Sequence, residues 1–129
     1  MKNSFPFHLA VHEVRQRDPR YAAEAYAFLC DALTHAVKLL DREDKDDRHV
    51  TGPELLMGFR DLALHEFGPM ALFVMHEWGI RCSEDVGNMV YNFIEVSYFG
   101  RNDNDRLEDF SDGISLEHEL TKPYQRLSP

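Results

Sequence analysis

The 129-residue chain has no long hydrophobic run and only two cysteines. No stretch approaches the roughly 20 apolar residues that a membrane-spanning helix requires. Residues 1–7 hold one lysine and no apolar segment of secretory type, so we expect no signal peptide. Cys30 and Cys82 lie far apart and form no C-x-x-C pair, which argues against a disulfide scaffold or a cysteine zinc site. These absences predict a cytoplasmic protein with reduced thiols and no membrane partner.

The sequence also lacks catalytic motifs. No P-loop, no G-x-G-x-x-G, no G-x-S-x-G and no kinase signature is present. Four histidines precede a glutamate, but none continues as H-E-x-x-H, the zinc motif of metalloproteases. Residues 103–113 have the composition of a calcium loop, yet Leu107 and Glu108 stand where an EF-hand needs a ligand and a glycine. We therefore expect a non-enzymatic protein that needs no cofactor.

Positive charge is scarce. The chain has 14 Lys and Arg against 23 Asp and Glu, a formal net charge of -9 with histidine neutral. Such a charge repels nucleic acid and anionic membranes, and it suits a partner with a basic surface. The only basic cluster is Arg15, Arg17 and Arg20. We interpret it as solvated side chains at a helix junction; a functional cluster of this kind would bind phosphate or an acidic protein.

Helical signals are strongest over residues 51–99. Thr51 and Glu54 have the spacing of a capping box, in which each side chain binds the backbone N–H of the other residue. The middle helix of this segment is apolar on nearly all sides, which predicts a central position in the core. The predicted helices are 51–67, 69–78 and 83–99, with Pro69 opening the second, Ser83 capping the third, and stops at Gly68, Gly79 and Gly100.

The flanking segments continue the helical pattern. Apolar spacing predicts a helix over about 5–17 and a second over about 19–40, with Asp18 capping that second helix and Pro19 in its first turn. Residues 41–48 and 101–113 are polar and acidic, so we expect loops there. Ile114, Leu116 and Leu120 fit either a short strand or a helical turn.

The predicted fold class is mostly α. We expect a single domain over residues 1–129, an irregular bundle of about five helices with an ordered core of about 5–116 and a tail of about 121–129. Residues 69–99 also allow a helix-turn-helix, with residues 101–116 as a wing. The second helix of this motif, which would read the DNA, carries Glu84 and Asp85 with little positive charge, whereas DNA binding needs several Lys or Arg.

Histidines near the start of the chain suggest a metal site. His8 and His12 lie one helical turn apart, and Glu13 is a neighbouring carboxylate. Two ligands from one helix do not complete the shell of four that zinc prefers. The simpler interpretation is a pair of exposed or half-buried imidazoles.

Several motifs together resemble a known family. They are D-P-R-Y from Asp18, H-V-T-G-x-E-L-L-x-G from His49, F-G-P-M-A-L from Phe67 and W-G-I-x-x-S-E-D-V-G-x-M-V-x-N-x-I-E from Trp78. This string resembles small conserved hypothetical proteins of planctomycetes and verrucomicrobia, an uncharacterised family. The resemblance covers roughly residues 7–113; residues 41–47 and the tail after 113 are less typical. It implies a stand-alone cytoplasmic bacterial protein, and it brings no assigned activity.

These observations rank the functional hypotheses. The first is a non-enzymatic interaction or regulatory protein that binds another protein, with a homodimer as one form of this. The second is a winged-helix-like regulator of nucleic acid, which a continuous arginine stripe through Arg15, Arg17 and Arg20 would favour. The third is a metal-dependent activity at His8, His12 and Glu13, which a stoichiometric bound metal would favour.

Overall fold

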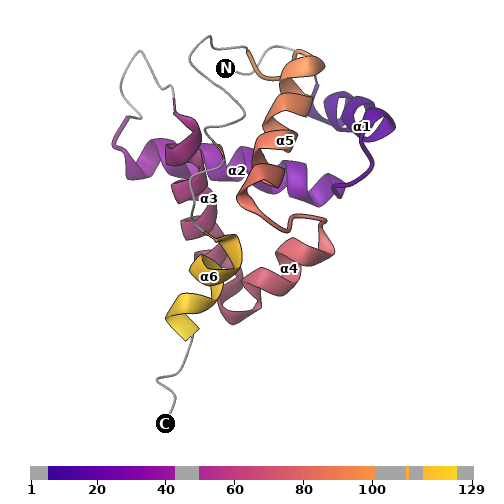
Figure 1. The fold of residues 1–129 in the computed structure, drawn as a ribbon. Helices are drawn as coiled ribbons and strands as arrows, with labels where there is room; N and C mark the ends of the chain where they lie inside the picture. Colours follow the sequence, from indigo (N-terminus) through magenta and orange to yellow (C-terminus); the bar gives the residue numbers. More distant parts are fainter. Residues whose placement is uncertain (1–5, 43–49, 101–109, 111–114, 125–129) are drawn as a thin grey trace.

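A computed structural model describes residues 6–42, 50–100, 110 and 115–124. The described residues contain no β-strand, so the prediction of a mostly α, single-domain bundle is confirmed (Figure 1). The elements are α1 (Phe7–Arg17), α2 (Ala23–Leu39), α3 (Gly52–Phe67), η1 (Gly68–Met70), α4 (Ala71–Glu77), α5 (Ser83–Glu95), α6 (Leu116–Thr121) and η3 (Lys122–Tyr124).

Two helices form the centre of the bundle. α3 packs closely on α2 at Gly58, which has no side chain. A Cβ atom added there would lie only 2.7 Å from the Cβ atom of Ala36. α5 contacts α1, α2 and α3, whereas α4 and α6 contact α3 and each other. Figure 1 shows α1 and α5 around one end of α2, and α4 and α6 beside the far end of α3.

The core is rich in aromatic rings, and those of α2 contact rings of both α3 and α5. Phe28 meets Phe59 of α3 edge to face, with ring centroids 5.0 Å apart. Tyr26, on the side of α2 toward α5, lies with its ring centroid 4.9 Å from that of Phe93. Edge-to-face and tilted contacts of this kind add to the stabilisation from burial alone. α2 is therefore the central helix of the protein.

The prediction that the 69–78 helix is central is wrong. α4 has seven residues, of which Ala71 and Met75 are buried. Phe73 is 57% exposed, and Met70, just before the helix, is 54% exposed. Apolar composition on all sides indicates burial only when neighbouring elements surround a helix, and α4 lies at the edge of the bundle.

Two of the predicted helix boundaries are confirmed in detail. Thr51 and Glu54 form the capping box: the Glu54 N–H donates to Thr51 Oγ1 at 3.3 Å, and the Thr51 N–H donates to Glu54 Oε1 at 3.0 Å. Gly79 ends the fourth helix with a φ of 91°. The Ile80 N–H then donates to the Met75 carbonyl at 2.9 Å, and Ile80 is fully buried.

The predicted ends of the fifth helix are both wrong. Ser83 is the first residue of α5 and is buried, and Cys82 takes the capping position before it. At the other end the helix stops before Gly100, because Ser97 adopts a φ of 64° and the Tyr98 N–H donates to the Phe93 carbonyl at 2.8 Å. Serine rarely adopts this left-handed conformation, so sequence rules favoured the glycine.

The predicted start of the second helix is also wrong. Residues 18–22 form a linker, and α2 begins at Ala23. Asp18 does not cap α2; its carboxylate accepts the N–H of Arg20 at 3.2 Å in a local turn. The Ala22 N–H donates to the Trp78 carbonyl at 3.1 Å, so a distant part of the chain holds the linker in place.

The C-terminal predictions divide in the same way. Leu116 and Leu120 lie buried in α6, so the helical turn is confirmed for them and the strand is wrong. Helical structure runs on through Tyr124, which shortens the predicted tail. Ile114 and most of the predicted acidic loops at 41–47 and 101–113 lie outside the described residues.

Candidate functional site

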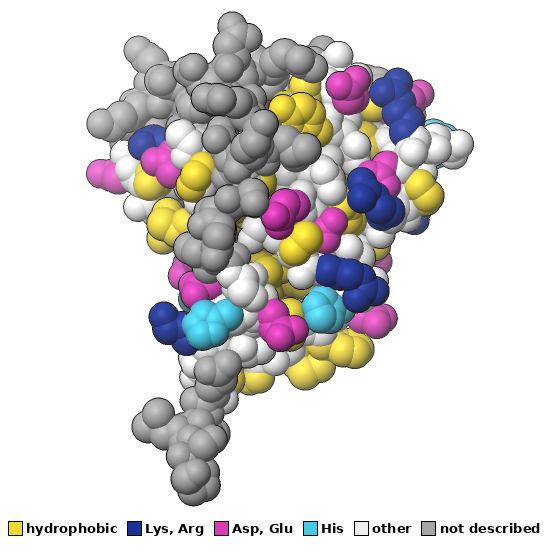
Figure 2. Space-filling model, viewed as in Figure 1, with side chains coloured by type: hydrophobic (Ala, Val, Ile, Leu, Met, Phe, Trp, Pro, Cys, Tyr) yellow, Lys and Arg dark blue, Asp and Glu magenta, His cyan; other side chains and the backbone are white. Residues whose placement is uncertain are grey.

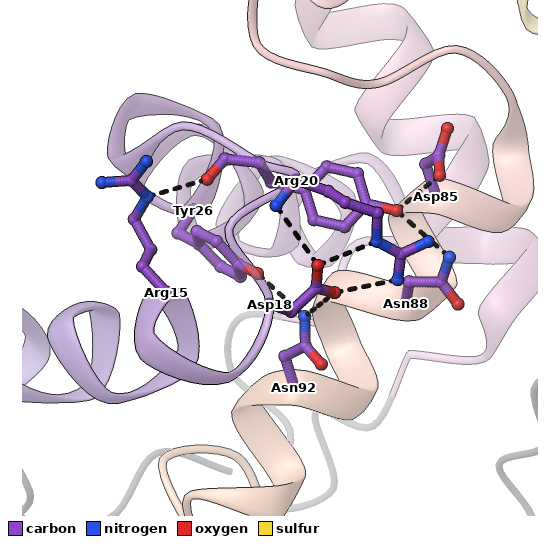
Figure 3. A network of polar contacts seen from close by, with 8 residues as sticks. Arg15, Asp18, Arg20, Tyr26, Asp85, Asn88 and Asn92 are labelled. Carbon is purple, nitrogen blue, oxygen red and sulfur yellow. Dashed lines mark hydrogen bonds and ion pairs between the residues drawn. The ribbon is translucent and has the colours of Figure 1, made fainter.

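Polar side chains of the linker at 18–22 meet one face of α5 (Figure 3). The α5 side chains are Asp85, Asn88 and Asn92, whose spacing of three and four residues places them on one side of a helix. Tyr26 of α2 joins the same network. These groups form one connected set of polar side chains, so we consider first what chemistry they can perform.

Asp18 is held as an anion. Arg20 donates to it through Nε and Nη2, each at 2.8 Å, and Asn92 Nδ2 donates at 3.0 Å. The guanidinium of Arg20 lowers the pKa of Asp18 to about 2. A carboxylate with this pKa stays ionised at neutral pH, so Asp18 cannot act there as a general acid, and its paired oxygens make it a poor general base.

Tyr21 links the linker to the first turn of α5. Its hydroxyl donates to Asp85 Oδ1 and accepts from Asn88 Nδ2 at 3.1 Å. The other carboxylate oxygen, Oδ2, accepts the N–H groups of Arg81 at 2.8 Å and Cys82 at 3.2 Å. One carboxylate thus binds the backbone just before α5 and fixes a buried phenol. Burial raises the pKa of Tyr21, and the Asp85 carboxylate raises it further, so the phenol remains protonated.

Tyr26 completes the network. Its hydroxyl accepts from Asn92 Nδ2 at 2.9 Å, and burial raises its pKa. In the described part of the chain, no buried side-chain nitrogen or oxygen lacks a hydrogen-bond partner. The buried polar atoms of the network therefore bind one another. The arrangement fastens α5 to the linker and to α2, a structural task.

The structure places the three predicted arginines in different surroundings. Arg20 is paired with Asp18, and Arg15 Nε donates to the Tyr21 carbonyl at 3.0 Å. Arg17 is exposed in the last turn of α1. Figure 2 shows Lys and Arg side chains along one side of the visible face, with Asp and Glu side chains between them. This mixture of charges on the visible face differs from the continuous stripe that nucleic-acid binding requires.

The predicted metal ligands are brought together only in part. His8 and His12 line a groove along α1 with a volume of about 470 Å³, and Glu13 is not among its lining residues. Nowhere in the described ranges do three or more His, Cys, Asp or Glu side chains gather as a group able to hold a metal ion. Within the described part of the chain, the metal-dependent hypothesis therefore has two candidate ligands in one groove.

An exposed apolar surface remains, which we call the α4 face and define as Met70, Phe73 and Tyr124. Met70 and Phe73 are one helical turn apart and more than half exposed, and Tyr124 is 43% exposed. Tyr124 borders η1, since a Cβ atom added at Gly68 would lie 3.6 Å from its hydroxyl. Figure 2 shows apolar side chains at the surface in the region of α4.

No family model, no curated protein and no solved structure matches this chain. The resemblance to small proteins of planctomycetes and verrucomicrobia therefore stays a prediction. None of the helices in the described ranges has both the length and the apolar character needed to cross a lipid bilayer. The functional argument consequently depends on the surfaces of the molecule itself.

Proposed function

We propose that this protein is a non-enzymatic interaction protein that binds a protein partner through the α4 face. One observation carries the proposal: Phe73 in α4 and Met70 just before it are 57% and 54% exposed at the edge of the bundle. Single exposed apolar side chains are common, but large neighbouring ones are typical of binding surfaces. Burying a phenylalanine or methionine side chain in an interface contributes about 1.5–3 kcal/mol.

The support beneath α4 favours binding without a large conformational cost. Gly79 and Ile80 fix the end of the helix, and Ala71 and Met75 anchor its inner side in the core. A rigid surface loses little conformational entropy when a partner covers it. The methionine adds a flexible side chain that adapts to the shape of the partner.

Charge supports a partner with a basic surface. The formal net charge of the chain is -9, which attracts cationic proteins at long range and accelerates their association. We therefore propose a partner that presents an apolar anchor for the α4 face and lysine or arginine side chains around it. A second copy of this acidic chain is the less favoured partner, since the two copies repel.

The test is a pull-down from the native cell with the wild type, a Met70→Ser/Phe73→Ser variant and a Leu39→Ser control. Leu39 ends α2 and is 47% exposed, so the control removes a comparable apolar surface elsewhere. We expect one stoichiometric protein with the wild type and the control, and binding weakened about tenfold or more in the double variant.

Two results would contradict the proposal. Equal recovery of the partner by all three proteins would remove the α4 face from the interaction. Recovery of specific DNA or RNA at physiological salt, in place of a protein, would favour the nucleic-acid hypothesis instead. Sedimentation equilibrium of the purified protein separates a homodimer from binding to a different protein.

A further inference from the structure

The groove along α1 unites residues from two of the sequence hypotheses. His8, His12 and Arg15 follow one another at spacings of four and three residues, so they share one side of the helix. The groove is lined by Phe7, His8, Val11, His12, Arg15, Gln16 and Ala23. Its volume of about 470 Å³ falls within the range of small-molecule sites, about 300–1,000 Å³.

Charge sets this groove apart from the rest of the protein. The chain carries a formal charge of -9, yet the described residues that line the groove include no Asp or Glu. They include one guanidinium and two imidazoles instead. A local concentration of nitrogen donors on an acidic protein favours an anionic ligand.

Arg15 is held in a fixed orientation. Its Nε donates to the carbonyl of Tyr21 at 3.0 Å, and Figure 3 shows its two terminal nitrogens pointing away from the polar network. A guanidinium presents its remaining N–H groups in a planar fork that matches a carboxylate or a phosphate. Because the backbone contact already restricts the side chain, less entropy is lost when an anion binds.

The floor of the groove is apolar and well supported. Val11 is 7% exposed. The ring of Phe7 packs edge to face on Phe93 and Tyr98, with centroids 6.2 and 5.8 Å apart. An apolar body laid over Phe7 and Val11 would be removed from water while its charged end reaches Arg15. A bare anion would leave this floor uncovered.

We propose that the α1 groove binds a small anion with an apolar body. The carboxylate or phosphate head contacts Arg15 and His12, and the apolar body covers Phe7 and Val11. This site is separate from the α4 face, so it stands or falls independently of the proposed partner binding. For a metal ion, the described groove residues supply these two imidazoles without a third His, Cys, Asp or Glu.

Calorimetric titration with four probes tests the proposal. Hexanoate and hexyl phosphate carry both the head and the apolar body, and acetate and inorganic phosphate carry the head alone. We expect saturable binding of at least one long probe, and affinity for its short counterpart lower by about tenfold or more. The tighter of the two long probes identifies the head group.

Matched variants assign the binding to the groove. Arg15→Gln removes the guanidinium, and His12→Gln alters an exposed side chain, so it leaves the core intact. Arg17→Gln is the control, since Arg17 is on the same helix but does not line the groove. We expect affinity to fall about tenfold or more in Arg15→Gln, to fall less in His12→Gln and to stay unchanged in Arg17→Gln, with circular dichroism confirming the fold.

Four outcomes would contradict the proposal. The first is no saturable binding of hexanoate or hexyl phosphate by the wild type. The second is binding that neither Arg15→Gln nor His12→Gln weakens. The third is an equal loss in Arg17→Gln, which would reveal attraction to charge in general. Acetate or inorganic phosphate binding as tightly as its long counterpart would remove the apolar body from the proposal.

Discussion

Gly79 occupies a position that no other residue fits. Its φ of 91° lies in the region that L-residues avoid, and a Cβ atom there would lie 2.1 Å from the carbonyl oxygen of Arg20. The glycine therefore does two things at once: it ends α4, and it lets the linker at 18–22 approach the backbone closely. The Ala22 hydrogen bond to Trp78 lies at the same contact.

Gly79→Ala should destabilise the protein by about 2–4 kcal/mol, because the clash with Arg20 adds to the cost of the left-handed conformation. Gly68→Ala is the matched control. Its φ of 53° and ψ of -131° also suit glycine, but among the described residues its added Cβ would meet the Tyr124 hydroxyl alone, at 3.6 Å, so a smaller loss of about 1–3 kcal/mol is expected. Urea unfolding measures both; equal losses would show that the close approach is unimportant.

Asp18 makes stability depend on acid pH. Its pKa falls from 3.8 in the unfolded chain to about 2 in the fold, since Arg20 and Asn92 bind the ionised form. A lowered folded-state pKa stabilises the protein above the unfolded value, and this contribution is lost as the pH falls from about 4 toward 2. Asp18→Asn should thus cost about 1 kcal/mol at pH 7, because Arg20 is largely exposed and solvent screens the pair.

The measurement is the free energy of unfolding of the wild type and of Asp18→Asn at pH 7, 4 and 2.5. The difference between the two proteins should be constant from pH 7 to 4 and should shrink below pH 4. A difference that stays constant to pH 2.5 would show that the charge of Asp18 contributes nothing and that only hydrogen bonding to the side chain matters.

At the scale of elements, the contact between α2 and α3 depends on a missing side chain. Gly58 faces Ala36, and an added Cβ would lie 2.7 Å from the Ala36 Cβ and 3.0 Å from its Cα. Alanine normally favours a helix over glycine by about 1 kcal/mol. Here that gain is opposed by forcing apart the two central helices.

Gly58→Ala should therefore cost about 1–3 kcal/mol despite its better helix propensity. The exchange Ala36→Gly/Gly58→Ala removes the shortest of these contacts, because residue 36 no longer has a Cβ atom. We expect the double variant to be more stable than Gly58→Ala alone, as measured by thermal unfolding. A purely additive double variant would mean that the two positions are not in close contact.

Helix boundaries show which parts of the structure a sequence can reveal. The capping box of Thr51 and Glu54 and the stop at Gly79 follow from residues within a few positions of each other, so local rules predict them. Ser97 escapes these rules because its strained conformation is imposed by burial of Tyr98 and Phe99 against Phe93. The start of α2 escapes them because Ala22 is bound by Trp78, far along the chain.

The sequence predicts only the α5 side of the polar network. Asp85, Asn88 and Asn92 fall on one side of any helix drawn through them, which marks a polar side of α5. Their partners Tyr21 and Tyr26 could not be named, because nothing local to either segment determines which helices meet. The sequence does not predict the groove or the α4 face for the same reason: the exposure of a side chain depends on which elements cover its helix.

At the scale of the whole molecule, the shared core predicts a single cooperative transition. Trp78 is the only tryptophan, and its ring lies 5.6 Å from those of both Phe28 and Phe67. Its fluorescence reports the junction of α2, α3 and α4, whereas far-ultraviolet circular dichroism reports all helices. We expect the two urea transitions to coincide, as for small single domains. Earlier loss of fluorescence would show that α4 unfolds separately.

The hydrogen bond between the Ala22 N–H and the Trp78 carbonyl has a consequence for folding during synthesis. The ribosome synthesises the linker at 18–22 well before the connection between α4 and α5 and the asparagines of α5. Until that later stretch has emerged, the phenols of Tyr21 and Tyr26 lack the side chains that bind their hydroxyls. A nascent chain stalled before Trp78 therefore lacks the α5 side chains that bind Tyr21 and Tyr26. The native arrangement of these two residues forms only after the second half of the chain has been translated.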